Sequence, residues 1–180
     1  LRRVLDTPEV QRLRLIRQTG LAYLVYPGME HSRFAHILGA YGIARRVFRH
    51  LRSLSEELLS TSTVTHSDLE ELERAFLVAA LCHDVGHTAF SHALESVLLP
   101  AGLKKHEDCS LLLLKDGSRL ANAIKKAGCD CEEVRLLLSR DHLFPGLSSL
   151  LTGPADVDRW DYLLRDTQAA NVFAGWHREW

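Results

Sequence analysis

The chain has 180 residues, a mass of 20.3 kDa and a net charge of −1 at pH 7. At this length one hydrophobic core can form without disulfides or metal ions, and the balanced charge excludes nucleic-acid binding through a general basic excess, so a nucleic-acid role would need a local patch. The four cysteines form no CxxC pair and no run of about 18 apolar residues exists, which predicts a cytoplasmic protein with reduced thiols and no membrane association.

The amino-terminal part of the chain is expected to be mainly helical, because apolar residues recur there at helical spacing. Residues 6–9 supply an N-cap residue, an early proline and an early carboxylate, so a helix is predicted over residues 7–18. Residues 23–26 are the only extended-looking stretch. A second helix is predicted over residues 32–51, and the polar residues 60–66 are the best loop candidate.

The third predicted helix is the most apolar of all. Ser67 and Glu70 have the spacing of a capping box and are expected to open it. The run from Ala75 to Cys82 is apolar on every side, which indicates a central, buried helix. Its end therefore places His83 and Asp84 in the interior.

The later part of the chain is expected to form shorter helices, over residues 91–99 and 106–115. Asp130 and Glu133 repeat the capping-box spacing and are expected to open another helix. The last helix begins near Pro154 and presents four polar side chains on one face: Asp158, Asp161, Tyr162 and Arg165. The predicted fold class is all-α, a helical bundle without internal repeats or a second domain.

The neighbouring residues His83 and Asp84 carry the strongest chemical signal. A buried carboxylate without a partner is costly, so Asp84 needs a metal ion, a cation or a hydrogen-bond network. The pair alone is explained equally well by a neutral His83 and an Asp84 that caps the next turn.

Other segments favour the metal interpretation. Seven of the ten histidines lie within the 71 residues from His36 to His106, among them His83, His87 and His92. A five- or six-coordinate divalent ion takes several nitrogen and oxygen ligands and leaves positions for water and substrate oxygens. His36 and Asp158 complete a set of two histidines and two aspartates with His83 and Asp84.

Four segments in this order resemble the HD superfamily, and within it the dNTP triphosphohydrolase branch that includes the SAMHD family and bacterial dNTPases. The order His…His-Asp…Asp is the pattern of the superfamily. The matching segments are DTPEVQRLRLIRQTG (6–20), YPGMEHSRFAHILG (26–39), HDVGHTAFSH (83–92) and DVDRWDYLLRD (156–166).

The resemblance implies an HD-domain bundle that hydrolyses a dNTP to the deoxynucleoside and inorganic triphosphate, with water attacking the α-phosphorus. It implies a divalent metal ion (Mg, Mn, Fe, Zn, Ni or Co) held by His36, His83, Asp84 and Asp158. It also implies nucleotide contacts from seven residues: Gln18, Arg33, His87, His92, Arg159, Tyr162 and Asp166. The catalytic residues that it implies are His106, with the acid Glu107 beside it, together with His92 and Glu95.

Simpler explanations exist for several of these side chains. Glu95 and Glu107 are equally well explained as solvated carboxylates, Tyr162 as core, and Arg159 as a salt-bridge partner of neighbouring aspartates. The remaining histidines are expected to be structural or exposed: His31, His50, His66, His142 and His177. A solvated helix face is expected for Arg12, Arg14 and Arg17.

Two rival functions stay open. One is an HD phosphohydrolase that acts on nucleoside monophosphates or other phosphoesters, and the other is a non-catalytic module that senses nucleotides. Relatives in this branch continue past the last metal aspartate, so residues 1–180 are expected to be a single HD domain, the catalytic core of a longer, homo-oligomeric protein. The expected partner is a nucleotide substrate, and a nucleic acid is not indicated.

Overall fold

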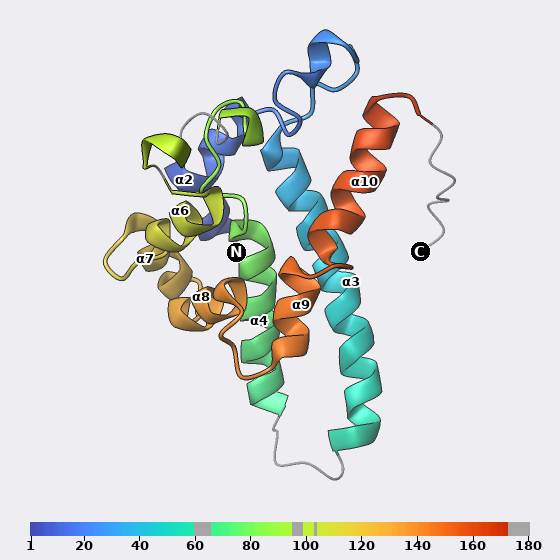
Figure 1. The fold of residues 1–180 in the computed structure, drawn as a ribbon. Helices are drawn as coiled ribbons and strands as arrows, with labels where there is room; N and C mark the ends of the chain where they lie inside the picture. The colour runs from blue at the N-terminus through green and yellow to red at the C-terminus, as the bar shows by residue number, and fades with distance from the viewer. Residues whose placement is uncertain (60–65, 95–98, 103, 173–180) are drawn as a thin grey trace.

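The computed structural model describes residues 1–59, 66–94, 99–102 and 104–172. Figure 1 shows these residues as a bundle of helices. In chain order the helices are α1 (Arg2–Leu5), α2 (Pro8–Gln11), η1 (Arg12–Leu15), η2 (Ala22–Leu24), α3 (Arg33–Leu59), α4 (His66–Cys82), η3 (Leu99–Ala101), α6 (His106–Leu113), α7 (Arg119–Lys126), α8 (Cys131–Ser139), α9 (Pro145–Thr152) and α10 (Val157–Ala169).

The predicted all-α class is confirmed. The described residues form no strand, and their single bridge of β type joins Arg17 to Ser32. No helix among them is long and apolar enough to cross a membrane.

The core is built around α4. Every residue from Ala75 to Cys82 is buried, which confirms that this helix is central. It packs against α3, α8 and α9, while α10 packs against α3 and α9 (Figure 1). The end of α4 thereby places His83 and Asp84 between α3 and α10.

The helix predicted over residues 7–18 is wrong in its second half. The short helix α2 forms in the first half, η1 follows it up to Leu15, and Ile16 is extended. The Ile16 carbonyl accepts a hydrogen bond from the Arg33 N–H group at 2.8 Å, and the Gln18 N–H group donates to the His31 carbonyl at 3.0 Å. These contacts with the start of α3 replace the hydrogen bonds that would have continued the helix.

The extended-looking residues 23–26 form a tight turn instead. The N–H groups of Val25 and Tyr26 both donate to the Ala22 carbonyl, and η2 results. β-branched and aromatic residues favour strands through packing on neighbouring strands, and no strand lies beside this segment in the described chain.

The second and third helices both differ from their predicted bounds. The second, α3, continues to Leu59 rather than ending at residue 51. Of the loop predicted over residues 60–66, residues 60–65 lie outside the described part, and His66 already belongs to α4. Ser67 therefore lies inside the helix and is not its N-cap.

The helix predicted over residues 91–99 is described only in part. Residues 92–94 are helical, residues 95–98 lie outside the described chain, and Leu99 begins η3. The helix predicted over residues 106–115 is confirmed as α6.

Aspartates cap the two helices α8 and α10. Asp130 accepts a hydrogen bond from the Glu132 N–H group at 2.9 Å, which confirms the predicted start of α8. Asp156 accepts one from the Arg159 N–H group at 2.7 Å, so α10 begins just after the predicted Pro154. Cap geometry thus fixes the position of the polar face of α10.

Candidate metal centre

The structure brings the four predicted metal ligands together. His36 lies in the first turn of α3, His83 and Asp84 follow α4, and Asp158 lies in the first turn of α10. The Nε2 atom of His36 is 2.9 Å from Asp158 Oδ1 and 3.2 Å from His83 Nε2. His83 Nε2 is 3.4 Å from Asp84 Oδ1 and 3.6 Å from Asp158 Oδ1. Ligands at about 2.1 Å from one ion are separated by about 3.0 to 3.4 Å, so a cation suits the group of His36, His83 and Asp84, and Asp158 lies beside it.

The orientation of the two imidazoles also fits a metal ion. His36 Nδ1 lies 2.8 Å from Asp161 Oδ2, and His83 Nδ1 lies 2.9 Å from the Ala80 carbonyl oxygen. Each Nδ1 therefore carries the proton and donates, which leaves the lone pair of each Nε2 facing the other ring. Two lone pairs facing each other at this distance repel unless a cation lies between them.

Three further histidines gather beside Asp84. The rings of His87 and His106 are stacked with centroids 3.8 Å apart, and the His92 ring lies 5.0 Å and 5.1 Å from them. His87 Nε2 is 3.4 Å from Asp84 Oδ1, and His106 Nδ1 is 3.3 Å from Glu107 Oε2. Several groups that can exchange protons thus adjoin the ligand cluster.

Arg33 is fixed within the same region. Its side chain is buried, and Nη1 donates to Asp84 Oδ2 at 2.5 Å while Nε donates to Ser91 Oγ at 2.9 Å. Nη2 donates to the Gln18 carbonyl at 3.3 Å. Asp84, His87 and His106 also lie close enough together to hold an ion. The Arg33 guanidinium already places a positive charge on Asp84, which disfavours a second metal ion there.

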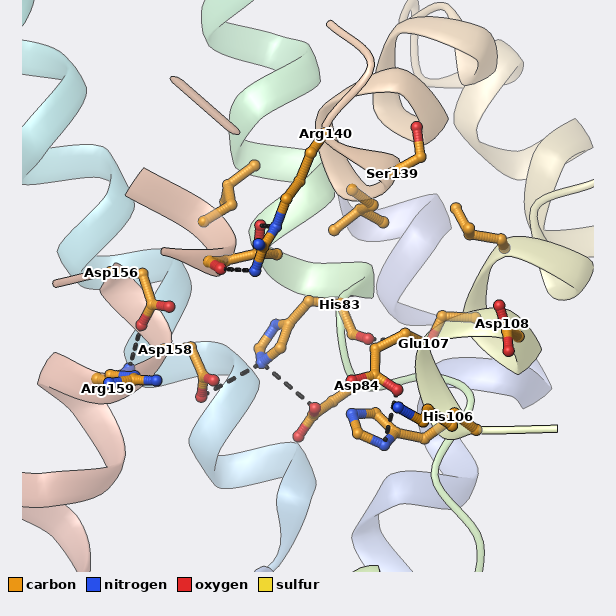
Figure 2. Close-up of a pocket in the computed structure, with 16 residues that line it drawn as sticks. His83, Asp84, His106, Glu107, Asp108, Ser139, Arg140, Asp156, Asp158 and Arg159 are labelled. Atoms are coloured by element: carbon orange, nitrogen blue, oxygen red, sulfur yellow. Dashed lines mark hydrogen bonds and ion pairs between the residues drawn. The ribbon is translucent and has the colours of Figure 1, made fainter. Parts of the chain in front are cut away.

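A cavity of about 500 Å³ opens beside the ligand cluster (Figure 2). It lies between the start of α6, the ends of α8 and α9, and the start of α10. Its walls include three of the predicted metal ligands, His83, Asp84 and Asp158. They also include the pair His106 and Glu107, and three cations, Lys105, Arg140 and Arg159.

Comparison with known proteins identifies the family, because the profile of the HD domain matches residues 33–166. The chain belongs to the HD domain family. The deoxynucleoside triphosphate triphosphohydrolase SAMHD1 of Bos taurus is 30% identical over 197 residues, which cover 92% of this chain and 32% of that protein. A putative HD domain-containing protein of Acanthamoeba polyphaga mimivirus is 30% identical over 182 residues, 94% of this chain and 40% of its own.

A solved structure is similar as well. The crystal structure of a phosphohydrolase from Bacteroides thetaiotaomicron matches with a TM-score of 0.77 and 30% identity, over 97% of this chain and 39% of that one. The chain therefore spans between 32% and 40% of the length of these three proteins. The predicted resemblance to the HD phosphohydrolases is confirmed.

Electrostatics in the HD site favour a cation at the ligand cluster. Burial opposes the charged form of His83, but the Asp84 and Asp158 carboxylates raise its pKa to about 9. Burial likewise opposes charge on His36, and hydrogen bonds to Asp158 and Asp161 raise its pKa. The pKa of Asp84 is held well below its usual range, since His83 and Arg33 outweigh its burial. Without a metal ion, protons therefore occupy this cluster.

His87 differs from the ligand histidines. Burial lowers its pKa to about 4, and Arg33 adds to this effect while Asp84 opposes it. Its imidazole is therefore neutral at pH 7 and can both donate and accept a hydrogen bond.

Three residues support the HD site in ways that the sequence did not indicate. Asp161 Oδ2 orients His36, and Arg165 holds the same carboxylate through two hydrogen bonds of 2.8 Å. Arg12 donates to the carbonyls of Val85 at 2.9 Å and His87 at 2.7 Å, which fixes the turn that carries the ligands. The expected solvated position of Arg12 is therefore wrong, whereas the spacing from Asp158 could have suggested Asp161.

Other predicted site residues lie apart from the cavity. Asp166 Oδ1 lies 2.8 Å from His31 Nε2, and neither Asp166 nor Tyr162 lines the cavity wall. Arg159 does line it, and its guanidinium donates to the Pro154 carbonyl rather than to a described carboxylate. Glu95 lies outside the described residues.

Four of the five histidines expected to be structural or exposed divide into three groups. His142 is buried, lies 2.8 Å from Glu133 and accepts a hydrogen bond from the Phe144 N–H group, which confirms a structural role. His50 is exposed, as expected. The side chains of His66 and His177 lie outside the described part.

Proposed function

We propose that this HD domain hydrolyses a deoxynucleoside triphosphate to the deoxynucleoside and inorganic triphosphate. The observation that carries the proposal is the set of four ligands, His36, His83, Asp84 and Asp158, beside a cavity with cations on its wall. The similarity to SAMHD1, a deoxynucleoside triphosphate triphosphohydrolase, supports this substrate class. Residues 1–180 form, in this proposal, the catalytic core of a longer protein.

His36, His83, Asp84 and Asp158 would hold a divalent ion, which when bound polarises the reacting phosphoryl group and lowers the pKa of water. A water oxygen attacks the α-phosphorus while the bond from phosphorus to the 5′ oxygen breaks. His92 and His106 move the two protons, one away from water and one to the leaving 5′ oxygen. Such proton transfer typically contributes about 10²- to 10⁴-fold in rate.

Arg33 serves the reacting phosphate in this proposal. Its guanidinium is rigidly held by Asp84 and Ser91, and it adds positive charge where negative charge builds up on the phosphoryl oxygens. Neutral His87 donates a hydrogen bond to the same group, and Arg159 neutralises phosphate charge from the cavity wall.

Gln18 is proposed to contact the sugar. Its Oε1 atom is buried and has no hydrogen-bond partner among the described residues, so it can accept a hydrogen bond from a ligand hydroxyl. Tyr162 and Asp166 follow Asp158 at four and eight residues along α10, which places them on the face that bears the metal ligand. Both are proposed to contact the nucleoside.

Product analysis by chromatography tests this proposal. The metal-loaded protein is offered each dNTP and each rNTP, beside a His83→Ala, Asp84→Ala variant. We expect deoxynucleoside and intact triphosphate, and the variant should release neither. Release of phosphate or pyrophosphate instead would favour the rival phosphoesterase. Tight dNTP binding without any turnover would favour the nucleotide-sensing module.

A further inference from the structure

Arg140 occupies a position where glycine is the usual residue. It follows α8 with a left-handed backbone, at φ 67° and ψ 17°. Side chains with a β-carbon disfavour this conformation, and glycine ends many helices for that reason. A non-glycine residue held there invites a functional explanation for its side chain.

The Arg140 guanidinium is oriented by one residue of α9. Its Nε atom donates to Thr152 Oγ1 at 3.0 Å, and Nη2 donates to the Thr152 carbonyl. Thr152 Oγ1 is itself fixed by a hydrogen bond to the Ser148 carbonyl at 3.1 Å. These contacts use Nε and Nη2 of a side chain that lines the cavity, and no contact of Nη1 with a described residue is present.

Arg140 has no ionic partner among the described residues, and the same is true of Lys105 and Arg159. All three line the same cavity as His83, Asp84 and Asp158. In Figure 2 the Arg140 side chain runs from the end of α8 towards His83, and Arg159 lies next to Asp156. The wall therefore carries three cations whose charge is not matched by a partner in ion-pair contact.

Three carboxylates besides the metal ligands also line the cavity. Glu107 lies 3.3 Å from His106 Nδ1, and Asp156 accepts the Arg159 N–H group as the cap of α10. Asp108 is exposed in the first turn of α6. None of them contacts Arg140, so the guanidinium is available to an anion.

We propose that Arg140 binds the phosphates beyond the reacting one, and so selects a polyphosphate ester over a monophosphate ester. This inference rests on the proposed function, which places the reacting phosphoryl group at His36, His83, Asp84 and Asp158. The cavity volume of about 500 Å³ lies within the range of roughly 300 to 1,000 Å³ that holds whole small-molecule ligands. A planar guanidinium binds two phosphate oxygens at once, which lysine cannot do.

Binding of inorganic tripolyphosphate and of orthophosphate, measured by calorimetry on the metal-loaded protein, tests the role of Arg140. We expect Arg140→Ala to weaken tripolyphosphate binding by about 10- to 100-fold, the usual effect of losing charged hydrogen bonds, and to leave orthophosphate binding within about 2-fold. Arg140→Lys should restore part of the loss. Metal content is measured afterwards, since tripolyphosphate also chelates metal ions.

Two variants control for folding and for charge. Arg140→Gly suits the left-handed backbone, so it should keep the Tm of the parent while losing tripolyphosphate affinity. Arg135→Ala removes a cation of α8 that pairs with Glu132 and does not line the cavity, and it should bind tripolyphosphate like the parent.

The outcomes separate this inference from the proposed reaction. If the parent releases triphosphate from a dNTP but Arg140→Gly keeps the parent's tripolyphosphate affinity and KM, the role of Arg140 is wrong and the reaction stands. If the parent cleaves no dNTP but binds tripolyphosphate through Arg140, the reaction is wrong and the anion site stands. A parent that binds no tripolyphosphate overturns the inference as well.

Discussion

His36 and His83 face each other through their Nε2 atoms at 3.2 Å, while the Nδ1 atom of each ring is hydrogen-bonded elsewhere. Asp161 and the Ala80 carbonyl accept those hydrogen bonds, so neither ring can turn its lone pair away. A cation must therefore occupy the space between the rings and the carboxylates of Asp84 and Asp158, and that cation is either a proton or a metal ion. Competition between the two leads to measurable consequences.

Metal binding should release protons. The pKa of His83 is raised to about 9, so the ring holds a proton at pH 7 that a metal ion must displace. We expect the apparent metal affinity to rise with pH up to about 9. Calorimetric titration of Mn²⁺ in two buffers of different ionisation enthalpy measures the number of protons released. An enthalpy that is the same in both buffers would contradict the prediction.

The thermal stability of the protein freed of metal by a chelator should fall as the pH rises, whereas its metal affinity should rise. Because the pKa of His83 is raised above its ordinary value of 6.5, the folded chain holds a proton that the unfolded chain releases. This contribution is fully present below pH 6.5 and is lost as the pH rises through about 9. The Tm of the metal-free protein should therefore fall across this interval, and the His83→Ala variant should show a smaller fall.

The clustering of the four predicted metal ligands could be anticipated from local sequence signals. His83 and Asp84 follow an apolar helix that must be central, and the four matching segments supply His36 and Asp158. Arg12 was expected on the solvated face of a continuous helix, and this expectation was wrong. The helix ends after Leu15, where the chain instead makes backbone hydrogen bonds with residues 31–33. Such long-range backbone contacts leave no mark on the periodicity of the sequence.

The remaining elements also separate into features with a local sequence signal and features that depend on packing. The eight-residue helices α7 and α9 were not predicted. The residue types at their starts are nevertheless typical of helix N-termini. Ser118 caps α7 by accepting a hydrogen bond from the Ala121 N–H group, and Pro145 is the first residue of α9. The spacing from Asp158 places Asp161 on the same face of α10, but its contact with His36 depends on where α10 crosses α3, which is a property of the packing.

Gly39 allows α10 to approach α3 closely at the metal centre. A β-carbon there would lie 1.7 Å from Asp161 Oδ1, so Gly39→Ala must displace the carboxylate that orients His36. We expect a loss of about 1 to 3 kcal/mol in the free energy of unfolding, together with weaker metal binding. Denaturant titration and metal calorimetry measure the two effects.

Gly42 provides the matched control on the same helix. A β-carbon at Gly42 meets no atom within 4 Å, so Gly42→Ala should stabilise the protein by about 0.5 to 1 kcal/mol through helix propensity alone. Metal affinity should be unchanged. Equal effects of the two substitutions would show that the crossing at Gly39 does not position Asp161.

Arg12 should control the metal centre without contacting it. Its guanidinium donates to the carbonyls of Val85 and His87, so Arg12→Ala frees the turn that holds His83 and Asp84. We expect a loss of about 1.5 to 3 kcal/mol in unfolding free energy, the usual value for a hydrogen bond with a charged donor, and a weaker metal affinity. Arg14→Ala is the control, because Arg14 stacks on Phe34 at 3.7 Å and contacts no atom of that turn. If both variants kept the parent's metal affinity while only Arg12→Ala lost stability, Arg12 would support the fold rather than position the ligands.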